Sequence, residues 1–168
     1  MRWREPPRAE CTKGERWGSV IAHGSGLIIG VPLAVSGILP LYIALAPCPV
    51  VAYYIGRAFR RRGLAWGAFQ ALQAALVLLL IVVLATLGSL QEDQLSRLSA
   101  TLWTFAALLF LYSLWGAWDT AFGYNFRYIG ISRLVARVSE ANIRRHERRK
   151  EWLAREQSNK RANKRPRS

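Results

Sequence analysis

The fold is decided by residues 17–56, which read WGSVIAHGSGLIIGVPLAVSGILPLYIALAPCPVVAYYIG and contain no Asp, Glu, Lys or Arg. Two further charge-free runs span residues 63–91 and 98–118. A charged side chain at the centre of a bilayer costs roughly 2.5–3.5 kcal/mol, and a helix needs about 20 apolar residues to cross the hydrocarbon core. Because charge is confined to the ends and the gaps between these runs, the sequence predicts an integral membrane protein.

The first run is long enough for two membrane crossings and too long for one. Residues that punctuate helices lie in its middle: Pro32, Ser36, Gly37 and Pro40. We therefore expect an all-α, polytopic transmembrane domain over residues 17–122, with four spans near 17–35, 38–56, 67–90 and 99–120. The alternative is that residues 17–56 form a re-entrant hairpin that returns without crossing, since prolines weaken the helices of this region.

Basic residues gather in three segments: an N-terminal arm at residues 1–16, a loop at residues 57–62 and a tail from residue 131. The tail alone has thirteen Lys and Arg against four Glu, which is +9 of the formal net charge of +14. Basic loops of membrane proteins stay in the cytoplasm. Four spans place all three segments on one side, so we expect both termini to be cytoplasmic.

Small residues recur every four positions along the first span: Gly18, Ala22, Gly26, Gly30 and Ala34. Similar stripes open the third span (Gly67, Ala71, Ala75) and close the fourth (Ser113, Ala117, Ala121). Membrane helices associate where small side chains let their backbones approach. These stripes predict either packing within one four-helix bundle or a face for a homodimer.

Few polar side chains enter the spans: His23, Gln70, Gln73 and Asp119. With cytoplasmic termini, all four fall in the inner third of the bilayer. Ionisable groups there are candidates for function, and His23 paired with Asp119 beside Gln70 is the predicted arrangement. The alternative is that His23 and the glutamines only bond between helices, while Asp119 reaches the headgroups. No catalytic constellation, cofactor motif or metal-ligand cluster is evident, so we expect no enzyme, cofactor or metal.

The two cysteines lie in different surroundings, Cys11 in the polar arm and Cys48 in an apolar span, so neither a disulfide nor a cysteine metal site is expected. The sequence around Cys48, Leu-Ala-Pro-Cys, is similar to a lipoprotein processing site. The preceding apolar stretch is about twice the length of a signal-peptide core, and proline obstructs processing. We therefore expect no cleavage there.

The tail is predicted to form a juxtamembrane amphipathic basic helix over residues 123–157, with apolar residues at helical spacing from Ile131. The residues expected to contact anionic lipid are Arg133, Arg137, Arg144, Arg145, Arg148, Arg149 and Lys150. Residues 158–168 are expected to be disordered, because they are almost wholly polar. Nucleic acid or a ribosome is the rival partner, since a basic tail binds any polyanion.

Several short motifs carry a resemblance to a known family. They are residues 15–17 (ERW), 22–26 (AHGSG), 68–72 (AFQAL) and 121–130 (AFGYNFRYIG). In these motifs the chain resembles a bacterial membrane domain of unknown function that is related to the Tic-twenty component of the chloroplast import machinery. The chain departs from the family's pattern at Ile129, where the family often has proline.

The resemblance covers residues 14–131 and implies four helices with both ends cytoplasmic, in the bacterial cytoplasmic (inner) membrane. It transfers no activity, because likeness of fold alone is a weak guide to function. We expect a non-enzymatic accessory or scaffold subunit of a membrane assembly, which associates with other membrane subunits or with itself. The alternative is a transport or protein-translocation component, as the plastid relative suggests.

Overall fold

The computed structural model describes residues 11–90 and 96–137, and this part of the chain is helical without strands. The chain divides into two compact units, Met1–Ser132 and Arg133–Ser168. Four helical segments of the first unit are long and apolar enough to cross a membrane: Lys13–Val35, Leu41–Arg61, Ala65–Leu90 and Arg97–Ala121. Within the described residues, the prediction of a helical fold with four such segments is confirmed.

The first helix, α1 (Lys13–Ser25), begins four residues before the predicted start at residue 17. Its N-terminus is closed by a capping box, in which Thr12 and Glu15 satisfy each other's backbone N–H groups. The Glu15 N–H donates to Thr12 Oγ1 at 3.2 Å, and the Thr12 N–H donates to Glu15 Oε2 at 3.0 Å. The sequence Thr-Lys-Gly-Glu therefore adds one turn to the first segment.

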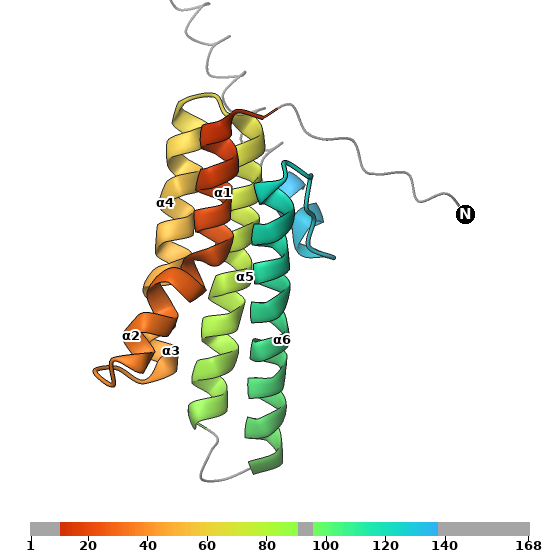
Figure 1. The fold of residues 1–168 in the computed structure, drawn as a ribbon. Coiled ribbons are helices and arrows are strands. Elements are labelled where there is room, and N and C mark those ends of the chain that lie inside the picture. Colours follow the sequence, from red (N-terminus) through yellow and green to blue (C-terminus); the bar gives the residue numbers. More distant parts are fainter. Residues whose placement is uncertain (1–10, 91–95, 138–168) are drawn as a thin grey trace, which may run out of the picture. The chain divides into compact units, whose positions relative to one another are not determined.

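Both of the first two segments are interrupted. After α1 comes a π-helical turn, η1 (Gly26–Gly30), in which the Val31 N–H donates to the Gly26 carbonyl, and then α2 (Val31–Val35). The second segment consists of α3 (Leu41–Leu45) and α4 (Pro47–Arg61). Proline lacks an N–H and crowds the preceding turn, so Pro32 and Pro47 account for the breaks. The α2–α3 hairpin bends away from the helices beside it (Figure 1).

The last two helices, α5 (Ala65–Leu90) and α6 (Ser96–Ala121), are unbroken (Figure 1). Helix α5 packs against α1, α3, α4 and α6, and 50% of the residues in its most apolar 18-residue stretch are buried. Helix α6 packs on α1 and α5, and only 17% of the residues in the corresponding stretch are buried. Helix α5 is therefore the core of the bundle, while α6 leaves most of its apolar surface uncovered.

The glycines of the first segment receive side chains from neighbouring helices of the same chain. A Cβ on Gly18 would clash with the ring of Phe59 from α4, and one on Gly26 would lie 2.6 Å from Phe110 of α6. A Cβ on Gly30 would lie 2.5 Å from a methyl group of Leu45 in α3. This stripe is therefore occupied by packing within the bundle, which is the first of the two interpretations of the sequence.

The close contact of Gly26 with Phe110 predicts a difference between two neighbouring glycines. A Cβ on Gly24 would meet Ile28 at an ordinary 3.6 Å. Because helix propensity changes equally in both, Gly26→Ala should be less stable than Gly24→Ala by about 1–3 kcal/mol, the usual cost of overpacking. Equilibrium unfolding of the full chain in mixed micelles measures this difference. Adding Phe110→Leu should shrink it.

Equal stability of the two variants would contradict this packing. So would a loss at Gly26→Ala that depends on protein concentration and is untouched by Phe110→Leu. That second pattern would instead assign the stripe to a dimer.

Candidate functional site

The chain leaves α6 and folds back onto the bundle. Gly123 adopts a positive φ of 80°, the Tyr124 N–H donates to the Asp119 carbonyl at 3.0 Å, and the Gly123 N–H donates to Thr120 at 3.0 Å. These bonds form a Schellman motif, which ends a helix. The side chain of Arg16 lies against Gly123, within 3.1 Å of where a Cβ would be.

The segment that follows is not the predicted helix. Residues 124–128 have no regular secondary structure, and helical backbone resumes only at residue 131. The predicted start of the amphipathic helix at residue 123 is wrong, because the glycine-terminated end of α6 redirects the chain. Of the predicted lipid contacts, Arg133 and Arg137 lie in the described helical residues and are exposed. The others, from Arg144 to Lys150, lie outside the described residues, as does the segment 158–168.

Two glutamines of α5 hold the returning segment by its backbone. Gln73 Oε1 accepts the Tyr128 N–H at 3.2 Å, and its Nε2 donates to the Phe126 carbonyl at 3.4 Å. Gln70 Nε2 donates to the same carbonyl at 3.1 Å and to Asn125 Oδ1 at 3.1 Å. Both glutamines are fully buried. Their side-chain amides supply hydrogen-bond partners that this irregular backbone does not find in a helix or a strand.

The side chain of Tyr128 enters the bundle and meets His23. Its hydroxyl lies 2.7 Å from Nδ1 of the imidazole, and both residues are 1% exposed. Burial raises the pKa of the Tyr128 phenol above its usual range, so the hydroxyl keeps its proton. The hydroxyl can therefore donate to Nδ1 when the imidazole carries its proton on Nε2.

The predicted pair of His23 and Asp119 does not form. The imidazole bonds to Tyr128, while Asp119 is half-buried near the end of α6. Helix α6 contributes Ser113 instead, whose hydroxyl donates to the His23 carbonyl at 2.9 Å. The structure thus brings three of the four predicted polar residues together, His23, Gln70 and Gln73, and leaves Asp119 apart from them.

An aromatic cluster closes over these polar groups. The ring of Phe126 packs edge-on against Tyr128 and Tyr112, with ring centroids 4.8 and 5.3 Å apart, and against His23 at 6.0 Å. Four buried side-chain atoms have no hydrogen-bond partner among the described residues, and two of them lie in this cluster: His23 Nε2 and Gln70 Oε1. The Gln70 side chain lies beside the imidazole, so these two atoms are a matching donor and acceptor.

Glu15 joins two helix N-termini and is a residue that the sequence reading did not single out as a site. Beyond its capping box, its Oε1 accepts the N–H of Gly67, in the first turn of α5, at 3.1 Å. The residue is 4% exposed. A carboxylate is favoured at helix N-termini, where unpaired N–H groups carry partial positive charge. The Thr-x-x-Glu spacing signalled the cap on α1, but nothing local to it signalled α5.

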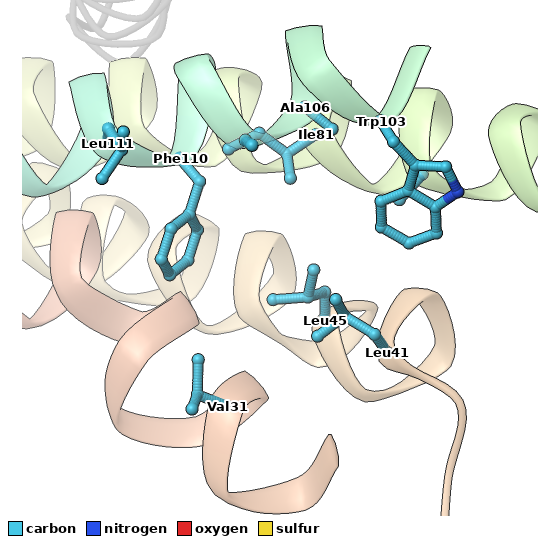
Figure 2. Close-up of a pocket in the computed structure, with 10 residues that line it drawn as sticks. Val31, Leu41, Leu45, Ile81, Trp103, Ala106, Phe110 and Leu111 are labelled. Atoms are coloured by element: carbon cyan, nitrogen blue, oxygen red, sulfur yellow. The ribbon is translucent and has the colours of Figure 1, made fainter. Parts of the chain in front are cut away.

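At the far end of the bundle, an apolar cleft of about 300 Å³ opens between the α2–α3 hairpin and helices α5 and α6. Its lining side chains include Leu45, Ile81, Trp103 and Phe110, with the small Ala106 between them (Figure 2). Val31 and Leu41 face these residues from the hairpin (Figure 2). Because the prolines turn the hairpin outward, side chains from α2 and α3 do not fill this space.

Within residues 11–90 and 96–137, no three His, Cys, Asp or Glu side chains gather where they could hold a metal ion. The two cysteines are free, with Cys48 buried. No protein-family model, curated protein or solved structure matches the chain. The resemblance to the Tic-twenty-related family therefore stays a prediction from the sequence motifs.

The glutamine contacts predict that Gln73 keeps the returning segment closed. In Gln73→Leu the Tyr128 N–H loses its partner, which costs about 1–3 kcal/mol for a buried group, while the Phe126 carbonyl keeps its bond from Gln70. Local opening should then be at least fivefold more frequent. Cleavage by trypsin after the exposed Arg127, followed by mass spectrometry of the full chain in detergent, reports this opening.

Thr86→Val is the matched control, because it also replaces a polar side chain of α5 by an apolar one. The Thr86 hydroxyl bonds only within its own helix, to the Val82 carbonyl at 2.8 Å. Its cleavage rate should equal that of the unmodified protein. If Gln73→Leu behaves like this control, the glutamine does not hold the segment.

Proposed function

We propose that the protein is a non-enzymatic accessory or scaffold subunit of a membrane assembly. The observation that carries this proposal is the unfilled apolar cleft between the α2–α3 hairpin and helices α5 and α6. Its volume suits bulky apolar side chains rather than a whole helix, which is about 10 Å across. A partner helix lying along this flank would seat such side chains in the cleft.

The exposed surface of α6 supports the same proposal. Apolar side chains follow one flank of the helix, and each is at least 57% exposed: Phe105, Leu108, Leu111, Trp115 and Trp118. Leu111 also lines the cleft, so the flank and the cleft are continuous. In a bilayer, association through such a surface depends on close packing rather than on hydrophobicity. The cleft supplies a shape into which a partner can pack.

A transport or translocation component is the weaker proposal, because it needs a polar path across the bundle. The buried polar side chains of α5 are Gln70 and Gln73, and residues 74–85 of that helix are apolar. The glutamines are also bonded to the returning segment rather than free to line a path. The two glutamine side chains therefore hold the returning segment against α5.

The proposed setting is the bacterial cytoplasmic membrane, with both termini in the cytoplasm. What supports this is the distribution of charge: the start of α1, the α4–α5 turn and the end of α6 lie at one end of the bundle (Figure 1), and in the sequence the three basic segments adjoin these points. The basic tail would then lie at the inner leaflet and contact anionic lipid. Contact with RNA or a ribosome is the competing proposal for the tail.

The scaffold proposal predicts that filling the cleft abolishes assembly. Ala107 lines the cleft and is exposed, so Ala107→Phe should occupy it without a clash in the core. Complexes isolated in mild detergent should lose the partner by tenfold or more. Ala100→Phe is the control, since it makes the same change at an exposed position of α6 outside the cleft. Equal effects of the two, or a monomer without any partner in the unmodified protein, would contradict the proposal.

The proposed topology predicts a pattern of cysteine labelling in bacterial cells. In a background with Cys11→Ser and Cys48→Ala, cysteines introduced at Arg61 and Ser158 should resist an impermeant reagent added outside, because basic segments are retained in the cytoplasm. A cysteine introduced at Gln94 should react. Labelling at position 61 from outside would contradict the four-span arrangement.

A further inference from the structure

We propose that helix α4 has a binding site of its own for an anionic phospholipid, separate from the basic tail. Five residues line one hollow at the C-terminal end of this helix: Tyr54, Arg57, Ala58, Arg61 and Arg62. Tyr54 and the three arginines are exposed. The proposal does not depend on the scaffold function, since it concerns a lipid rather than a protein partner.

Helical spacing brings three of these residues onto one line. Tyr54, Arg57 and Arg61 follow one another at intervals of three and four, which stacks their side chains on one face. Arg60 is exposed too but does not line the hollow. It lies ~100° around the helix from Arg61. The site is thus a directional arrangement of two or three guanidinium groups rather than the whole basic loop.

Charge on this face is not neutralised by nearby carboxylates of the described chain. Within the described residues, 11–90 and 96–137, the acidic residues are Glu15 and Asp119. Glu15 is buried and bonded to Thr12 and Gly67, and Asp119 lies on α6. Arginine binds phosphate oxygens through several N–H donors at once. The hollow therefore complements a phosphate group in charge and in hydrogen-bond donors.

The face of α4 also changes polarity in the order of a phospholipid. One turn before Tyr54 on the same face lies Val50, which is 52% exposed, and Tyr54 is 62% exposed. Arg57 and Arg61 follow in the next two turns. An apolar residue suits acyl chains, a tyrosine suits the boundary with the headgroups, and arginines suit the phosphate. A free phosphate or RNA would use the arginines but not the first two residues.

The test uses the full chain in neutral detergent and measures binding of phosphatidylglycerol by native mass spectrometry, with thermal stabilisation as a second readout. Arg57→Gln combined with Arg61→Gln should weaken binding at least tenfold, because each basic residue near anionic lipid contributes about a fivefold factor. Arg60→Gln combined with Arg127→Gln removes the same charge from exposed positions outside the hollow. This control should change binding less than twofold.

Three results would overturn the proposal. Equal weakening by the two double variants would show that only net charge matters. Complete loss of binding when Arg148, Arg149 and Lys150 are changed to Gln, with no effect of the α4 pair, would assign the lipid to the tail. Equal stabilisation by inorganic phosphate or by an RNA oligonucleotide, at matched phosphate concentration, would show a polyanion surface rather than a lipid site. Phosphatidylcholine should bind equally weakly to every variant.

Discussion

The structure depends on how the N–H and C=O groups of a non-helical stretch of backbone find hydrogen-bond partners inside an apolar bundle. A helix satisfies its own N–H and C=O groups, but residues 124–128 have no such ladder. Each buried group left unpaired costs about 1–3 kcal/mol. Gln70 and Gln73 meet this demand, because a carboxamide offers both a donor and an acceptor at the end of a flexible chain. These two side chains make the return of the segment possible.

The return of this segment links three helices. Tyr128 bonds to His23 of α1, while the glutamines are on α5 and the segment itself continues from α6. Ser113 of α6 and His23 add a direct bond between α6 and α1. Glu15 joins α1 to α5 at the same end of the bundle. Most polar residues of the spans therefore tie one end of the bundle together, and among the described residues no side-chain hydrogen bond joins the α2–α3 hairpin to α5 or α6.

How much the sequence could predict follows from the range of each interaction. The charge-free runs located all four segments, because the cost of burying charge in lipid acts on every residue independently. The polar side chains of the first and third segments were also found, since polarity is visible one residue at a time. Their partner was not, because Tyr128 lies 105 positions from His23 and outside every apolar run. Asp119 was a plausible partner only because it was the one acidic residue in a span.

The positions of the cleft and of the polar cluster both follow from where the sequence has prolines and where it has polar residues. Pro32, Pro40 and Pro47 fall in the hairpin half of the first two segments, where they break the helices, so that α3 packs against α5 but the hairpin leaves a cleft beside α5 and α6. Most polar side chains that bond between helices are at the other end; at this end the Ser99 hydroxyl of α6 donates to the Gly88 carbonyl of α5 at 2.8 Å, which joins those two helices but not the hairpin. In lipid, no hydrophobic force closes the gap between apolar helices, so a break that is not bridged by polar bonds stays open. The scaffold proposal places a partner at this opening, where the hairpin side chains do not fill the space beside α5 and α6.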